Sequence, residues 1–428
     1  MTEPAATPGD QRRAPSLVRW WQLFLGVICM SMVANLQYGW TLFVDPINDK
    51  HHWGRPAIQA TFSIFILVET WLVPLEGYLV DRVGPKVVGV GSGVLVALAW
   101  VINSSADSLP LLYLGAVIGG IGVGGVYGAT VGNALKWFPD RRGLASGLTA
   151  MGFGAGSALT VVPIANMIKA QGYEATFLKF GIIQGAVVFV VGWLLKAPPA
   201  GFTAPKNPAA RVGASPATER TPLEMAQTPA FWIMYVMFVL TATFGLIATA
   251  QLTAIAKDFH VTDSPVALFG LTMAALPFAL ATSRILNGVT RPFFGWVSDH
   301  LGRENTMFVA FSLEGVAILL LGSHGGNATA FVLLTCLVYF GFGEIFSLFP
   351  AICGDTYGKK FAAANAGLLY TAKGAAALLV VPGGLIATKY GWHVVFVAGA
   401  AMSFVAAIMA LLVLKPVRTR MNSVGAIT

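Results

Sequence analysis

Long hydrophobic stretches alternate with short polar ones along almost the whole chain. An apolar segment of about 20 residues is long enough to cross the hydrocarbon core of a bilayer as a helix. The pattern predicts twelve such segments, in two sets of six that a polar stretch separates. We therefore expect an all-α membrane protein with twelve transmembrane helices. The first set covers approximately residues 20–44, 57–80, 86–104, 109–134, 143–168 and 174–196, and the second covers 230–254, 265–297, 306–323, 330–352, 361–388 and 392–414.

The polar stretch divides the chain into three parts. Residues 197–228 are rich in Pro, Ala, Thr and charge, which is typical of a linker. Residues 1–196 precede it, with a short polar tail and six predicted helices, and residues 229–428 follow it with six more helices and a second short tail. We name these two parts the N-half and the C-half, and we expect each to form a six-helix bundle.

A loop motif, Gly-x-x-x-Asp-x-x-Gly, recurs at the same place in both halves, at residues 77–84 and 295–302. Its first copy follows the second span, and its second copy follows the eighth span 218 residues later. The basic pair Arg141-Arg142 matches Lys359-Lys360 at the same offset. Glycine permits a tight turn with positive φ, and an aspartate can accept hydrogen bonds from a helix N-terminus or a neighbouring arginine. The repeat predicts two pseudo-symmetric bundles, with gating loops at Gly77, Asp81, Arg82, Gly84, Arg141, Arg142, Gly295, Asp299, Gly302 and Arg303.

Composition and charge exclude several functional classes. Hydrophobic residues make up 56% of the chain and charged residues only 11%, whereas soluble domains carry about 25% charged residues. The net charge of +8 does not indicate a nucleic-acid partner, because the Lys and Arg residues sit in short loops between spans. Most of them fall on the side of the two termini, which predicts a bacterial-type inner membrane protein with both termini in the cytoplasm. Since no catalytic or metal-ligand motif is present in the sequence, we expect neither an enzyme nor a cofactor.

Two cations fall near the middle of predicted spans. Arg291 lies eight residues before Asp299, about 12 Å up its helix, and Lys373 lies about 18 Å into its span. A charged side chain at the bilayer centre costs about 2.5–3.5 kcal/mol or more, so such residues mark binding sites or ion pathways. The two cations predict a pocket for a small anion with two closely spaced negative oxygens. The alternative is that each forms a structural ion pair with a neighbouring helix.

Three further ionisable residues fall within spans. Arg284 lies seven residues before Arg291, on the same helix face, and Glu344 lies in the middle of the tenth span. We expect a salt bridge between Arg284 and Glu344, because an unpaired charge in hydrocarbon is costly. The alternative is proton coupling through a buried carboxyl group. Glu69, in the second span, is either such a proton carrier or a hydrogen-bonded structural carboxyl.

Five further motifs stand out along the chain: Gln37-Tyr38-Gly-Trp40-Thr41, Gly125-Val-Tyr127-Gly128, Trp137 to Gly147, Asn287 to Gly295 and Ala372-Lys373-Gly. The duplicated loop resembles the major facilitator superfamily, and these five motifs resemble, within it, the bacterial oxalate:formate antiporter family. The resemblance implies two bundles that rock around a central site, with Arg291 and Lys373 binding a dicarboxylate. The two tryptophans and one tyrosine of that family's aromatic box are replaced here by phenylalanine and tyrosine, which weakens the case for strict oxalate selectivity. The lining residues that the resemblance implies are Gln37, Tyr38, Tyr127, Phe342, Phe346 and Tyr370.

These observations predict a secondary active transporter of small carboxylate anions that works by alternating access. Oxalate:formate exchange, which the resemblance implies, is the first hypothesis. The exchange requirement has a physical reading, because two close cations repel each other without an anion and resist closure. A proton-linked monocarboxylate symporter that uses Arg291 with Glu69 or Glu344 is the alternative. A membrane anion sensor that does not transport is a further one. We expect the carboxylate anion and the lipid bilayer as partners, no nucleic acid and no obligatory protein partner, so that the monomer is functional.

Overall fold

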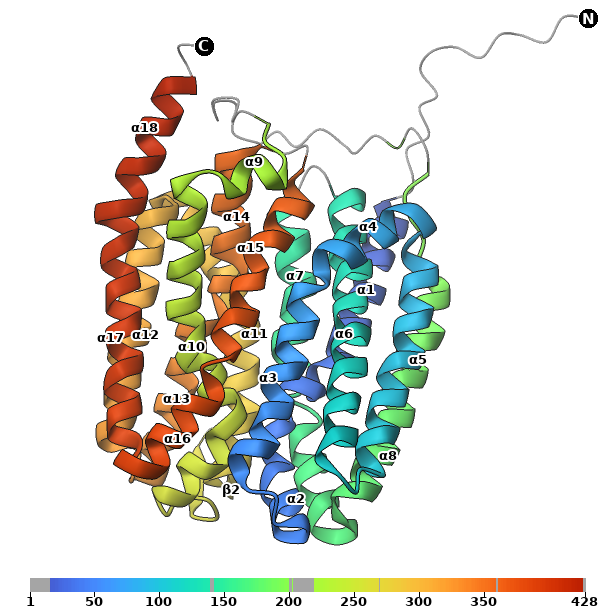
Figure 1. Cartoon of the computed structure of the whole chain (residues 1–428), viewed down its shortest axis with the longest axis vertical. Helices are drawn as coiled ribbons and strands as arrows, with labels where there is room; N and C mark the ends of the chain where they lie inside the picture. The colour runs from blue at the N-terminus through green and yellow to red at the C-terminus, as the bar shows by residue number, and fades with distance from the viewer. Residues whose placement is uncertain are drawn as a thin grey trace, which may run out of the picture.

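The computed structural model describes residues 16–138, 142–199, 202, 219–268, 270–358 and 361–425. Its helices run along one common direction and form two groups that lie side by side, the N-half in blue to green and the C-half in yellow to red (Figure 1). Helices α1 and α18 have their outer ends at the same end of the molecule, which we call the terminal side (Figure 1). The opposite end carries α2 and a short β-hairpin, and we call it the hairpin side (Figure 1).

The N-half contains eight α-helices and one 3₁₀ turn among the described residues. They are α1 (Ser16–Tyr38), η1 (Trp40–Leu42), α2 (Val44–His51), α3 (Arg55–Trp71), α4 (Val73–Val83), α5 (Pro85–Ser104), α6 (Leu109–Trp137), α7 (Arg142–Ala155) and α8 (Val161–Leu194).

The linker ends in a single helical turn, and the C-half then follows. The elements are α9 (Pro222–Ala226), α10 (Pro229–Asp258), β1 (Pro265–Leu268), β2 (Leu271–Ala274), α11 (Ala275–Leu301), α12 (Arg303–His324), α13 (Ala328–Gly343), α14 (Ile345–Tyr357), α15 (Ala362–Ala377), α16 (Val380–Tyr390), α17 (Trp392–Met409), the π-helical η2 (Ala410–Leu414) and α18 (Lys415–Gly425).

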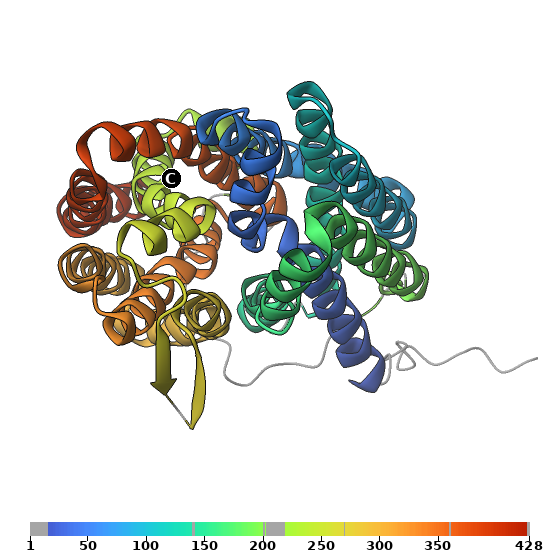
Figure 2. The same ribbon diagram turned by 90° about the horizontal axis from the view of Figure 1, so that it is seen from below.

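The hairpin is a departure from the predicted all-helical chain. Strands β1 and β2 pair antiparallel, with Pro265 opposite Ala274, and the hairpin projects from the C-half in Figure 2. The eighth span was expected to begin at residue 265, but α11 begins only at Ala275. Gly270 lies between the strands with φ of +77°, a conformation that a helix does not allow and that glycine adopts without strain.

The crossing segments agree with the hydrophobic pattern. Within the described residues, nine helices are long and apolar enough to cross a bilayer, and α3 with α4, bent by 44°, forms a tenth span. Helix α11, with 27 residues, is long enough to cross but is not among these apolar spans. Helix α8 is interrupted at Gly172, whose φ of 84° and ψ of 167° are not helical, so it contributes parts of two spans. With α11 included and α8 taken as two, these segments are consistent with the predicted twelve spans.

Two helix breaks follow from prolines at matching places in the two halves. Helix α7 ends at Ala155 and α8 starts at Val161, two residues before Pro163. In the C-half, α15 ends at Ala377 and α16 starts at Val380, two residues before Pro382. A proline ring clashes with the carbonyl four residues earlier and has no N–H to donate, so each helix breaks just upstream of its proline.

The duplicated loop motif adopts one backbone conformation twice. Gly84 has φ of 86° and ψ of 160°, and Gly302 has φ of 87° and ψ of 154°. Each glycine ends one helix and immediately precedes the next, which explains why the motif requires glycine at this position. Arg303 Nε lies 2.9 Å from Asp355 Oδ2, a salt bridge within the C-half. The guanidinium of Arg82 lies over the ring of Tyr78.

The remaining loop residues are less constrained by the structure. A side chain at Gly77 would meet no atom within 4 Å, and one at Gly295 would only touch Ser347. Arg141, Lys359 and Lys360 lie outside the described residues, as do the side chains of Asp81, Arg142 and Asp299. The gating role of these loops therefore stays a prediction.

Small residues bring the two halves into close contact beside the centre of the molecule. A Cβ atom at Gly154 of α7 would lie 3.0 Å from the Cα atom of Gly288 in α11. A Cβ atom at Gly374 of α15 would lie 2.3 Å from Thr70 Oγ1 and 2.7 Å from a ring atom of Trp71, both near the end of α3. These contacts place α7 against α11 and α3 against α15, because glycine lets backbones approach closely.

Candidate functional site

Lys373 lies at the centre of the interface between the halves, on α15. Its side chain is fully buried, and its ammonium donates to Gln37 Oε1 at 2.9 Å and to the Tyr370 hydroxyl at 3.1 Å. It also donates to both oxygens of Glu69, at 3.1 and 3.0 Å. Gln37 and Glu69 belong to α1 and α3 of the N-half. The lysine of one half is therefore held by an amide and a carboxylate of the other half.

Arg291 lies on α11 and is also buried. Its Nη1 donates to the carbonyl oxygen of Ala150 in α7 at 2.8 Å, and its Nη2 donates to Asn287 Oδ1 at 3.1 Å and to the Tyr38 hydroxyl at 3.4 Å. Its guanidinium lies 4.4 Å from the ring centroid of Phe346. All of these partners are uncharged, so none of them is a counter-ion for the guanidinium.

The two predicted cations share one aromatic neighbour. The Lys373 ammonium lies 5.7 Å from the Phe346 ring that also faces Arg291. Tyr370 lies 6.1 Å from the same ring and stacks on Tyr127 of α6 at 5.0 Å. An aromatic wall therefore lies beside the two cations, with Phe346 and Tyr370 from the C-half and Tyr127 from the N-half.

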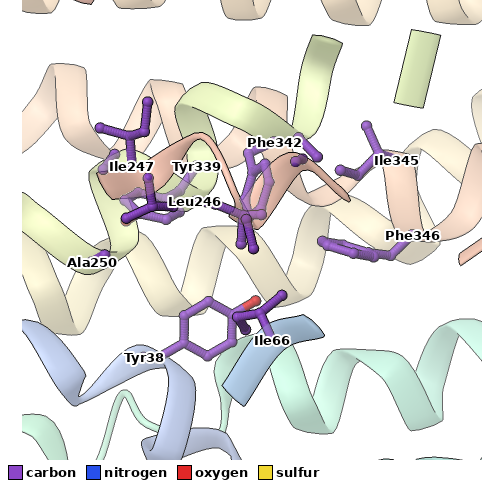
Figure 3. Packing of buried hydrophobic residues seen from close by; sticks show 14 of the residues in the cluster. Tyr38, Ile66, Leu246, Ile247, Ala250, Tyr339, Phe342, Ile345 and Phe346 are labelled. Carbon is purple, nitrogen blue, oxygen red and sulfur yellow. The ribbon is translucent and has the colours of Figure 1, made fainter. Parts of the chain in front are cut away.

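Tyr38 and Phe342 complete the predicted lining. Figure 3 shows Tyr38 on the N-half, with Phe342 and Phe346 on the C-half across from it. The Tyr38 hydroxyl donates to Asn287 Oδ1 at 3.3 Å, and the Phe342 ring packs edge-on against Phe346 at 5.5 Å. The structure thus brings all eight residues that the resemblance implied to one buried region.

The expected salt bridge between Arg284 and Glu344 is not formed. Arg284 is fully buried between the rings of Tyr38 and Tyr339, at 4.5 and 4.2 Å, and its Nη2 donates to the Tyr339 hydroxyl at 3.3 Å. Its Nε and Nη1 have no acceptor, and neither carboxylate oxygen of Glu344 has a donor. Glu344 instead occupies the break between α13 and α14. The error has a physical reason: aromatic faces surround the guanidinium, and nothing in the sequence showed which helix face Glu344 takes.

Glu69 is the carboxylate that does pair with a cation. Its pairing with Lys373 joins residues 304 positions apart and crosses the interface between the halves. The sequence left Glu69 as a proton carrier or a structural carboxyl and did not connect it to Lys373. This pair also fits the alternative in which a buried cation is neutralised by a neighbouring helix.

Three residues at the site were not predicted. Asn287 binds both Arg291 and Tyr38, and its position one helical turn before Arg291 was the available signal. Tyr339 covers one face of Arg284. Phe153 packs against Tyr38 at 5.5 Å and lies 5.4 Å from the Lys373 ammonium, and its position in α7 gave no chemical signal.

Comparison with known proteins shows the family of this chain. The model of the Major Facilitator Superfamily matches residues 23–288 and 244–426. The chain belongs to the major facilitator superfamily. It is a multi-pass membrane protein and a transporter of this superfamily.

Individual relatives show how far the likeness extends. The chain is 32% identical over 400 residues to the oxalate:formate antiporter of Oxalobacter formigenes, covering 92% of this chain and 91% of that protein. It is 30% identical to an uncharacterised 38 kDa protein of Thermoproteus tenax over 83% of this chain and 85% of that one. It is also 30% identical to human monocarboxylate transporter 11, over 40% of this chain and 37% of that protein.

Proposed function

We propose that this transporter exchanges small carboxylate anions across the inner membrane, with oxalate and formate as the first pair to test. The observation that carries the proposal is the placement of two buried C-half cations, Arg291 and Lys373, at 4.4 and 5.7 Å from the centroid of the same Phe346 ring. Both cations are bonded to N-half groups, so the site lies where the two halves meet. The similarity to the oxalate:formate antiporter supports the same function.

The chemistry of the two cations suits a carboxylate. A guanidinium presents a planar fork to two oxygens, whereas an ammonium acts as a mobile point charge. The aromatic wall of Phe346, Tyr370 and Tyr127 excludes water and strengthens both charge interactions. We propose that Gln37, Tyr38 and Phe342 complete the lining, that the terminal side faces the cytoplasm, and that the monomer is the functional unit.

Transport into liposomes tests the proposal. The purified protein is reconstituted into vesicles loaded with oxalate or formate, and uptake of labelled oxalate is measured. We expect saturable uptake by the wild type and none by Lys373→Ala. Lys179→Ala is the matched control, because Lys179 is exposed on α8 and bonds only Gln171 among the described residues. Normal exchange by Lys373→Ala contradicts the proposed site.

A proton-linked monocarboxylate symporter is the second candidate. The observation that favours it is Glu69, a carboxylate on Lys373 that would release the lysine on taking up a proton. The partial likeness to human monocarboxylate transporter 11 points the same way. Uptake of labelled lactate or formate that requires an inward proton gradient would support symport over exchange. Flux of either kind would exclude a sensor that does not transport.

A further inference from the structure

The ammonium of Lys373 has no hydrogen-bonding capacity to spare. An ammonium has three N–H donors, and four oxygens lie within 3.1 Å of Lys373 Nζ. Two of them are the oxygens of Glu69, and both side chains of the ion pair are essentially inaccessible. A carboxylate substrate can therefore gain a charge-assisted hydrogen bond from Lys373 only by displacing one of these oxygens, and Glu69 supplies two of the four.

The ion pair spans the contact that alternating access has to rearrange. Near Glu69, the Trp71 indole donates to the carbonyl oxygen of Thr371 in α15 at 3.0 Å. On the other side of the pair, the Ser63 hydroxyl of α3 donates to the carbonyl oxygen of Ala377 at 2.7 Å. Hydrogen bonds thus join α3 to α15 at the level of Lys373 and on both sides of it along the helices. A charge that holds Lys373 here stabilises the closed contact between the halves.

The charge balance makes Glu69 a match for a substrate carboxylate. Both are single carboxylate groups, and the Glu69 carboxylate already approaches Lys373 with both oxygens. A buried cation without a counter-ion is strongly unfavourable, which is why two unpaired cations would hinder closure. When Glu69 is bound to Lys373, Arg291 is the one of the two cations that has no counter-ion. Its guanidinium donates instead to neutral oxygens of Ala150, Asn287 and Tyr38.

We propose that Glu69 substitutes for the substrate carboxylate on Lys373 and so allows the carrier to change its access without a bound anion. The inference rests on the proposed function for its physiological meaning. It reverses one expectation from the sequence, that repulsion between the cations enforces strict exchange. The transporter then carries out net movement of an anion in addition to exchange, and a substrate enters by displacing Glu69 from Lys373.

The central test compares two rates in the same liposomes. Exchange is measured as uptake of labelled oxalate into oxalate-loaded vesicles, and net transport as uptake into vesicles without internal oxalate. Valinomycin and potassium hold the membrane potential constant, since net anion movement carries charge. For the wild type we expect net transport well above protein-free vesicles. In Glu69→Gln we expect the ratio of net transport to exchange to fall about tenfold or more, while exchange continues.

Glu76→Gln is the matched control, because Glu76 lies seven residues later on α4 and forms no hydrogen bond with Lys373. Its ratio should equal that of the wild type. Glu69→Asp keeps the charge on a shorter side chain and should recover part of the net transport. An unchanged ratio in Glu69→Gln, or a wild type that exchanges oxalate but moves none into vesicles without internal oxalate, overturns the inference.

A labelling experiment tests the same idea without any substrate. Single cysteines are placed at Gly367, buried in α15 toward the terminal side, and at Ser63, buried in α3 toward the hairpin side. The protein with its three native cysteines alone gives the background labelling, which is subtracted. The wild-type background should label at both positions, and Glu69→Gln should slow labelling at one of them about tenfold. Equal rates at both positions in the two backgrounds contradict the inference.

These two experiments separate the inference from the proposed function. If the wild type moves neither oxalate nor formate, the proposed function fails, and the labelling rates still decide whether Glu69 supports the change of access. If exchange is present and Glu69→Gln leaves both the flux ratio and the labelling unchanged, the proposed function stands and the inference fails.

Discussion

Gly154 offers a direct test of how tightly the halves have to close around the site. A Cβ atom at this position would lie 2.8 Å from Asn287 Oδ1, 3.0 Å from Gly288 Cα and 3.1 Å from Arg291 Nε. Real carbon contacts are longer than this, so Gly154→Ala forces α7 away from α11. Overpacking of this kind costs about 1–3 kcal/mol. The cost falls on the contact between the halves, because α7 and α11 belong to different halves.

The expected consequence is a loss of transport with little loss of stability. A penalty of about 1–3 kcal/mol lowers the population of the closed arrangement about 5- to 150-fold. We expect anion exchange in liposomes to fall by a factor in that range. The melting temperature in detergent should hardly change, since each bundle keeps its own packing when the halves separate slightly.

Gly91→Ala is the control for this prediction. Gly91 lies exposed on α5, and a Cβ atom there would meet no other atom within 4 Å. The same chemical change should leave exchange at the wild-type rate. The reasoning about closure is refuted if Gly154→Ala also exchanges at the wild-type rate, because the close approach of α7 to α11 would then have no part in transport.

Three further substitutions address single interactions. Arg291→Lys removes the fork that reaches the Ala150 carbonyl oxygen, and we expect the half-saturation concentration for oxalate to rise about tenfold or more in the exchange assay; an unchanged value would contradict carboxylate binding by the fork. Arg284→Gln removes a buried charge that has no counter-ion, so the free energy of unfolding should rise by about 1 kcal/mol or more in a thermal unfolding experiment, while the rate of exchange declines. A fall in the free energy of unfolding would argue against the unpaired charge. Arg303→Ala breaks a partly exposed bridge to Asp355, which predicts a stability change under about 1 kcal/mol; a larger drop in the melting temperature would indicate that this bridge holds the bundle together.

The crossing segments and the duplicated halves could be predicted from the sequence because the bilayer imposes them directly. A hydrocarbon core requires about 20 apolar residues in each helix, and that requirement is visible in any linear sequence. The helix breaks near Pro163 and Pro382 follow from the missing N–H and the ring clash of proline. Glycine in the duplicated loop motif likewise indicated the backbone conformation that Gly84 and Gly302 share.

The partners of the buried charges could not be predicted in the same way. Periodicity places Arg284, Arg291, Lys373 and Glu69 inside the membrane, but every one of these helices has several possible neighbours. The structure brings Glu69 to Lys373 over a separation of 304 residues, whereas Arg284 lies between two tyrosine rings and leaves Glu344 unpaired. The sequence by itself determined which residues cross the membrane and which charges are buried there. Only the tertiary structure decided which charges meet, because their pairing depends on how twelve helices rotate and tilt against one another, and hydrophobic pattern carries no information about that packing.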